Sequence, residues 1–154
     1  MTSRLAELGL ELPRAFSAPP GAEFRFAAAR VAGDLVHVSG HGPLDGAEIL
    51  MSGRIGEDLD ARQGYDAARL TGLSILATLD ELLGDLDRVT GWVKALGFVR
   101  CAPGFNETPA VIDGFSDLIL ELWGGEGRHA RSAIGVAELP FGIPVEIEAI
   151  AEIR

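Results

Sequence analysis

The sequence predicts one α+β domain in which two helices cover a single face of a mixed β-sheet. Segments with strand and helix patterns follow one another in the order strand, strand, helix, strand, helix, strand, strand. Two long stretches place apolar residues at helical spacing, whereas several of the shorter segments are strand-like apolar runs. No repeat, linker or low-complexity tract divides the 154 residues. We therefore expect residues 1–154 to form one domain.

The first part of the chain predicts a short helix and a hairpin. Residues 1–22 read as an N-terminal extension, with a short helix over Ser3–Leu10. Phe24–Val31 has the composition of a first strand. The dipeptide Gly33-Asp34 is typical of a tight turn, which would lead into a second strand over Leu35–Ser39.

The middle of the chain predicts two helices with a strand between them. Asp60–Leu83 has the longest helical pattern, and Gly84 is suited to end it. Val89–Val99 reads as a strand of low polarity. Thr108-Pro109 is typical of a helix start, with threonine as the N-cap and proline in the first helical position. The apolar stripe of this second helix consists of Val111, Ile112, Phe115, Leu118, Ile119 and Leu122.

Two final strand patterns, Ala130–Ala137 and Val145–Ile153, flank a turn rich in proline and glycine. Successive side chains of a strand point to opposite faces. We assign Ile134 to the core face of the first run and Arg131 to the other face, together with Ala133 and Gly135. The core face of the second run is Val145, Ile147, Ala149 and Ala151.

Glu146 lies on the face of the second run that is opposite this core face. If both core faces pack under the same helices, Arg131 and Glu146 project together on the far side of the sheet. A cation and a carboxylate would then share a ligand site with a floor of small residues. Two helices leave that far face uncovered, and its apolar side chains predict an interface between subunits.

The charge and composition exclude several classes of function. The net charge is −10, from 13 Lys plus Arg and 23 Asp plus Glu, whereas nucleic-acid binding needs a basic surface. The single cysteine, Cys101, excludes an internal disulfide, and the three histidines lack the spacing of metal ligands. No apolar run is long enough to span a bilayer, and acidic residues near the N-terminus argue against a signal peptide. We expect a cytoplasmic protein without membrane, metal or cofactor.

Three stretches resemble the Rid family of imine deaminases, also called YjgF-like or endoribonuclease L-PSP proteins. They are R-S-A-I-G-V-A-E-L-P at 131–140, V-E-I-E-A-I-A at 145–151 and V-H-V-S-G-H-G-P at 36–43. The resemblance implies a chorismate-mutase-like fold and a homotrimer with ligand clefts between its subunits. It also implies hydrolysis of small imines to a carbonyl compound and ammonia.

The resemblance also implies roles for individual residues. Arg131 would bind a ligand carboxylate, which a guanidinium can hold through two parallel hydrogen bonds. Glu146 would position or activate the attacking water, and the backbone of Gly40 would line the cleft. Glu148 and His129 are the alternatives for handling the proton. His37 is predicted to be a satisfied histidine of the sheet, and His41 to lie in a loop.

Three positions of the implied substrate site differ from the well-studied deaminases of the family. Phe26 stands in place of a tyrosine, Ala133 in place of a cysteine and Pro109 in place of an asparagine. Each replacement removes a hydrogen-bonding or thiol group. The sequence therefore leaves two hypotheses, an imine-hydrolysing enzyme and a non-catalytic trimer that binds a small carboxylate ligand. A nuclease is a distant third because of the charge, and chorismate mutase activity would rest on fold analogy alone.

Overall fold

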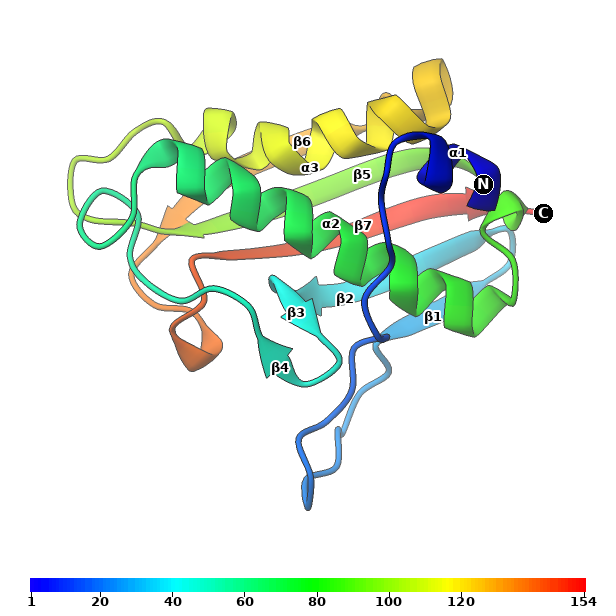
Figure 1. Ribbon diagram of the computed structural model, residues 1–154, viewed down its shortest axis with the longest axis horizontal. Helices are drawn as coiled ribbons and strands as arrows, with labels where there is room; N and C mark the ends of the chain where they lie inside the picture. Colours follow the sequence, from blue (N-terminus) through cyan, green and yellow to red (C-terminus); the bar gives the residue numbers. More distant parts are fainter.

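The computed structural model describes residues 1–154, and its centre is a five-stranded mixed sheet with the spatial order β1-β2-β7-β5-β6 (Figure 1). Only β5 and β6 are parallel, and all other pairs are antiparallel. A separate two-stranded sheet pairs β3 with β4. The strands are β1 (Ala29–Ala32), β2 (Leu35–His41), β3 (Leu44–Asp45), β4 (Glu48–Ile49), β5 (Val89–Arg100), β6 (Ala130–Val136) and β7 (Val145–Ile153).

Two long helices, α2 (Ala61–Leu83) and α3 (Thr108–Trp123), lie side by side on one face of the sheet (Figure 1). The other helical segments are short: α1 (Thr2–Glu7), η1 (Leu86–Arg88), η2 (Gly124–Gly127) and η3 (Pro140–Gly142). No helix of the protein has the length and hydropathy needed to cross a bilayer. The observed order of major elements is the predicted one.

The start and end of α2 confirm the prediction from the sequence. Asp60 is the N-cap, and its carboxylate accepts a hydrogen bond from the backbone N–H of Gln63. The Gln63 side chain in turn accepts from the backbone N–H of Asp60, which completes a capping box. Gly84 ends the helix with a φ of 76°, a left-handed conformation that favours glycine.

The start of α3 differs from the prediction. Glu107, not Thr108, occupies the N-cap position, and Thr108 is already helical and buried. Its hydroxyl donates to the carbonyl of Ala133 in β6 at 3.1 Å. A tertiary hydrogen bond to the sheet therefore replaces the local cap that the Thr-Pro pair predicts.

The predicted apolar stripe of α3 is confirmed, because all six of its residues are buried. Beside this stripe, Gly114 permits a close approach between α3 and α2. A Cβ atom at Gly114 would lie 2.0 Å from the carbonyl oxygen of Tyr65. The two helices therefore form a tightly packed layer above the sheet.

The first hairpin is confirmed, but its first strand is shorter than predicted. The Gly33-Asp34 turn joins Ala32 to Leu35 as predicted. Residues 24–28 make no strand, although the prediction extended β1 back to Phe24. The Phe24 ring instead packs between Phe16 and Phe26, with 4.8 Å between ring centroids on each side. Aromatic packing, rather than strand pairing, therefore fixes this segment.

Candidate functional site

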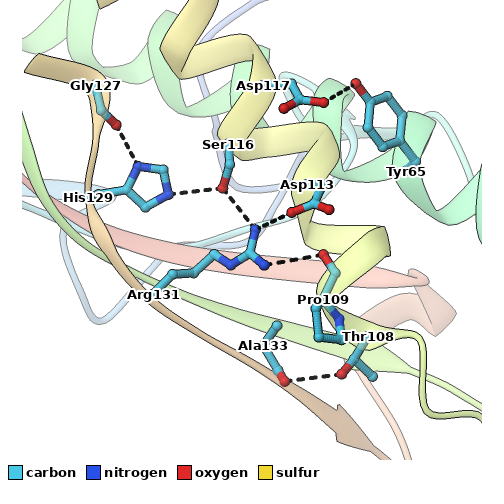
Figure 2. A network of polar contacts seen from close by, with 10 residues as sticks. All are labelled: Tyr65, Thr108, Pro109, Asp113, Ser116, Asp117, Gly127, His129, Arg131 and Ala133. Carbon is cyan, nitrogen blue, oxygen red and sulfur yellow. Dashed lines mark hydrogen bonds and ion pairs between the residues drawn. The ribbon is translucent and has the colours of Figure 1, made fainter. Parts of the chain in front are cut away.

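Arg131 lies on the edge strand β6 and points towards α3 (Figure 2). Its Nη1 donates to Oδ1 of Asp113 at 2.8 Å and to Oγ of Ser116 at 3.0 Å. Its Nη2 donates to the carbonyl of Pro109 at 3.3 Å. A guanidinium has five N–H donors, and these three bonds leave the Nε–H and one Nη2–H without a partner. Two parallel N–H groups are what a carboxylate needs for bidentate binding.

Ser116 and His129 extend this network away from Arg131 (Figure 2). Nδ1 of His129 lies 2.8 Å from the carbonyl of Gly127, so Nδ1 carries the proton. Nε2 therefore accepts from the Ser116 hydroxyl at 3.0 Å. Burial is the main cause that lowers the pKa of His129, and the nearby charge of Arg131 lowers it further. His129 is thus a neutral group that orients Ser116, which in turn supports the guanidinium.

Glu146 lies on β7 and packs against Gly40. A Cβ atom at Gly40 would lie 2.8 Å from Cδ of Glu146, so the glycine leaves the space that the carboxyl group occupies. Gly40 falls in an irregular stretch of β2, where the register with β7 shifts between Val38 and His41. Such bulges often redirect side chains near functional sites. Burial raises the pKa of Glu146, and the charge of Glu148 raises it further.

The structure contradicts the prediction that Arg131 and Glu146 project from the same face of one subunit. Arg131 is paired with Ala95, which is fully buried under the helices. Glu146 is paired with Phe98, whose neighbour on β6 is Ile134. Paired residues point to the same face, so Arg131 lies on the helix side and Glu146 on the far side.

Ile134 shows why that prediction was wrong. The alternation along β6 was correct, but its large apolar residue was assigned to the core. Ile134 is 44% exposed on the far face. The helix side of β6 carries small residues instead, because α3 and its preceding loop approach closely. A Cβ atom at Gly135 would lie 2.9 Å from Sγ of Cys101.

Each of the other predicted site residues lies either beside Arg131 on the helix side or near Glu146 on the far side of the sheet. Ala133 and Pro109 lie beside Arg131, where their carbonyls accept hydrogen bonds from Thr108 and Arg131 respectively. Phe26 precedes β1 and is 55% exposed on the side of Glu146 and Gly40. One half-site therefore contains Arg131, Ala133 and Pro109, and the other contains Glu146, Gly40 and Phe26.

The remaining histidines differ from the predictions in different ways, since His41 lies in a strand rather than a loop and His37 lies in the predicted strand but without a partner. His41 is the last residue of β2 and fully buried, with Nε2 2.9 Å from Oγ1 of Thr78 and Nδ1 2.7 Å from the carbonyl of Ser39. His37 is exposed on the far face and makes no hydrogen bond, so it is not a satisfied sheet histidine. No three His, Cys, Asp or Glu side chains come close enough to hold a metal ion together.

The sequence did not point to Asp113 or Ser116 as members of the site. Both are polar residues of α3, three positions apart and outside its apolar stripe. That pattern is typical of any solvated helix face. Only the tertiary contact between α3 and β6 brings them to Arg131, and no local signal predicts it.

Comparison with known proteins supports the resemblance found in the sequence. A family model described as "YjgF/chorismate mutase-like, putative endoribonuclease" matches residues 2–151. The chain belongs to the YjgF family. It is 41% identical over 155 residues to Protein TCP17 of Trypanosoma cruzi, a match that covers all of this chain and 94% of TCP17. The mixed α+β fold is consistent with the chorismate-mutase-like fold of the YjgF family.

Solved structures of similar proteins share the fold. The protein Atu1372 of Agrobacterium tumefaciens, which has unknown function, is 40% identical with a TM-score of 0.89, over 99% of this chain and 91% of Atu1372. TdcF of Escherichia coli, solved with bound serine, is 25% identical with a TM-score of 0.62. That match covers 94% of this chain and 96% of TdcF.

Proposed function

We propose that this YjgF-family protein hydrolyses small imine or enamine intermediates to a carbonyl compound and ammonia, in clefts between the subunits of a homotrimer. The observation that carries the proposal is the Arg131 guanidinium, which is held in place by three hydrogen bonds and retains two free N–H groups. This arrangement suits a substrate carboxylate. The bound serine of TdcF, an amino acid with such a carboxylate, supports the same class of ligand.

Glu146 supplies the second part of the proposed chemistry. Its carboxylate accepts a proton from a water molecule while the water oxygen forms a bond to the imine carbon. That proton passes to the substrate nitrogen and gives a carbinolamine. The hydroxyl proton of the carbinolamine then passes through Glu146 to the nitrogen while the carbon–nitrogen bond breaks and the carbon–oxygen double bond forms, so the carbonyl compound and ammonia leave. The reaction consumes one water molecule and needs no oxidant or cofactor. Because burial raises the pKa of Glu146, its carboxylate is a stronger base than an ordinary glutamate.

A cleft that uses both residues requires two chains. Arg131 and Glu146 lie on opposite faces of one sheet, so a single subunit cannot present them to one small substrate. In the proposed trimer, Arg131 of one subunit therefore meets Glu146 of a neighbour. The far face supports this assembly, because Ile134, at 44% exposure, and the part-exposed Leu96, Phe98 and Ile150 lie on the side that no helix covers.

A second candidate is a trimer that binds small carboxylate ligands without catalysis. Three observations favour it: Phe26, Ala133 and Pro109 offer no side-chain hydrogen bond or thiol at the proposed site. A substrate imine would then be oriented only by Arg131 and by backbone groups. The carboxylate-binding half-site could thus remain after the chemistry is lost.

The test is ammonia release from freshly generated 2-aminoacrylate and from bulkier imino acids. We expect turnover by the wild type, and a loss of about 10–100-fold in kcat/KM for Arg131→Ala, because a charge-assisted hydrogen bond contributes about 1.5–3 kcal/mol. Arg62→Ala is the control, since Arg62 pairs with Asp66 on the exposed surface of α2. Full turnover by Arg131→Ala would contradict the proposal. A wild type that binds 2-keto acids through Arg131 but never turns over would favour the second candidate.

A further inference from the structure

We infer that Ser116 and His129 form a nucleophile–base pair that hydrolyses small carboxylic esters on the helix side of the sheet. This activity goes beyond the proposed imine hydrolysis and does not depend on it, because it uses neither Glu146 nor the far face. The two side chains line a pocket of about 190 Å³ beside α3, η2 and the start of β6. This volume is below the range of about 300–1,000 Å³ that is usual for drug-sized ligands, so the pocket suits a short acyl group.

Three groups in a row give Ser116 the surroundings of an activated nucleophile (Figure 2). The Ser116 hydroxyl donates to Nε2 of His129 at 3.0 Å, and Nδ1 of His129 donates to the carbonyl of Gly127 at 2.8 Å. A hydroxyl becomes a useful nucleophile when a neighbouring base takes its proton and a third group orients that base. The carbonyl of Gly127 is this third group, because it keeps the proton on Nδ1 and the lone pair of Nε2 towards Ser116.

The imidazole of His129 is held in place and is available as a base. The ring of Phe115 packs edge-on against it, with 5.5 Å between the ring centroids. Burial lowers the pKa of His129, and the charge of Arg131 lowers it further. The imidazole is therefore neutral at pH 7 and can accept a proton from the Ser116 hydroxyl.

The hydroxyl of Ser116 points away from its own helix. A hydroxyl inside a helix can bond to the carbonyl four residues before it, as Thr71 does with Ala67 at 2.8 Å. Ser116 instead donates to His129 and accepts a hydrogen bond from Nη1 of Arg131 at 3.0 Å. Tertiary contacts therefore direct its oxygen into the pocket between α3 and β6.

Two cations stand where an ester would develop negative charge. Arg131 contacts Oγ of Ser116 directly, and Arg128 lines the same pocket. When Oγ attacks a carbonyl carbon, the carbonyl oxygen becomes an anion within reach of this positive field. Positive groups that are already in place stabilise such an oxyanion more than the neutral ester. The arrangement therefore favours the transition state of acyl transfer.

The proposed reaction has two steps. In the first, Oγ of Ser116 forms a bond to the carbonyl carbon, its proton passes to Nε2 of His129, and the alcohol leaves with that proton. In the second, a water molecule gives a proton to Nε2 and attacks the acyl carbon, and Ser116 regains the proton as the acid leaves. One ester and one water become one acid and one alcohol, and no oxidant, reductant or cofactor takes part.

The experiment treats the full-length protein with an alkyl fluorophosphonate, which forms a covalent bond to nucleophilic serines with loss of fluoride. We expect one adduct in the intact mass, and peptide mapping should place it on Ser116. The protein should also hydrolyse 4-nitrophenyl acetate. Ser116→Ala should lose both the adduct and this hydrolysis. His129→Gln should lower both rates by about 10²–10⁴-fold, the usual contribution of a general base.

The control is Ser52→Ala, because Ser52 is an exposed serine of a loop, and its adduct and turnover should equal those of the wild type. Thermal unfolding checks that each variant is folded, and the wild-type adduct decides the question if Ser116→Ala does not fold. A wild type that stays unlabelled, or that carries its adduct on a residue other than Ser116, would overturn the inference. Labelling of Ser116 at an undiminished rate in His129→Gln would overturn it as well.

Discussion

Arg131 combines a structural contact with two free donors. Its partner Asp113 has a side chain that is 51% exposed, and Arg131 itself is 20% exposed. An ion pair that is open to water on one side contributes only about 0–1 kcal/mol. The hydrogen bonds from Arg131 to Ser116 and to the Pro109 carbonyl therefore matter more for holding the guanidinium in one orientation. A ligand carboxylate can reach it without breaking a strong internal bond.

Glu146→Gln tests the base in the proposed reaction. The substitution keeps the size of the side chain that packs against Gly40, but it removes the negative charge. Turnover should fall by about 10²–10⁴-fold, the usual contribution of general acid–base catalysis, while ligand affinity changes much less. Steady-state kinetics and equilibrium binding measure the two effects. Unchanged turnover would move the proton transfer to Glu148 or His129.

We expect the folded protein to lose stability in acid because His41 is buried. Burial lowers its pKa from 6.5 to about 4, so the unfolded chain takes up a proton at a higher pH than the folded protein does. The stabilising contribution is complete above pH 6.5 and is lost as the pH falls towards 4. It amounts to about 3 kcal/mol at 1.36 kcal/mol per pKa unit.

Urea unfolding at several pH values between 7 and 4 measures this contribution. The variant His41→Gln cannot titrate, so its free energy of unfolding should fall less steeply in this window than that of the wild type. The comparison also removes the background effect of Glu146, whose raised pKa acts in the opposite direction. Parallel curves for the two proteins would show that His41 is not the cause.

At the scale of secondary-structure elements, the contact between α2 and α3 depends on Gly114. We expect Gly114→Ala to lower the free energy of unfolding by about 1–3 kcal/mol, the usual cost of overpacking, because the new Cβ atom would lie 2.0 Å from the Tyr65 carbonyl. Gly125→Ala is the matched control, since its Cβ atom would meet nothing within 4 Å. Thermal unfolding of both variants measures the difference. Equal stability would mean that the helices can separate without cost.

Individual elements show how far the sequence predicts this structure. Helix α2 was predicted with its bounds and its terminal glycine, because the helical periodicity and the glycine signal are local. Strand β7 was predicted with the correct core face, because it carries the regular alternation of a strand covered on one side. For β6 the alternation did not reveal which face is covered. Its contact with α3 is tertiary, and small residues lie where that contact is closest.

The sequence likewise predicted only part of the candidate site. The family resemblance singled out Arg131, Glu146 and Gly40, and the structure places Gly40 against Glu146. The resemblance could not predict Asp113 and Ser116, which reach Arg131 only through the packing of α3. Nor could it predict that Arg131 and Glu146 lie on opposite faces, since that depends on the phase of β6. The residues were therefore accessible from the sequence, but their arrangement was not.

At the scale of the whole molecule, Arg131 and Glu146 lie on opposite faces of the sheet, so two different subunits must supply them to one proposed cleft. In a cyclic trimer each cleft joins unlike surfaces of two subunits. If the proposed trimer brings both residues into each cleft, Arg131→Ala damages one side of every cleft, and Glu146→Gln damages the other side. Each variant alone has no intact cleft. A mixed trimer contains some clefts that combine the unchanged Arg131 of one subunit with the unchanged Glu146 of its neighbour.

The mixed assembly therefore predicts recovery of activity from two inactive proteins. After equal amounts of Arg131→Ala and Glu146→Gln are dissociated and reassembled together, about a quarter of the clefts carry both unchanged residues, if subunits combine at random around the ring. Ammonia release should rise to about that fraction of the wild-type rate, and light scattering should show a trimer. The double variant, reassembled with wild type in the same way, controls for the procedure. Mixtures that stay inactive although they form trimers would mean that Arg131 and Glu146 do not act in the same cleft.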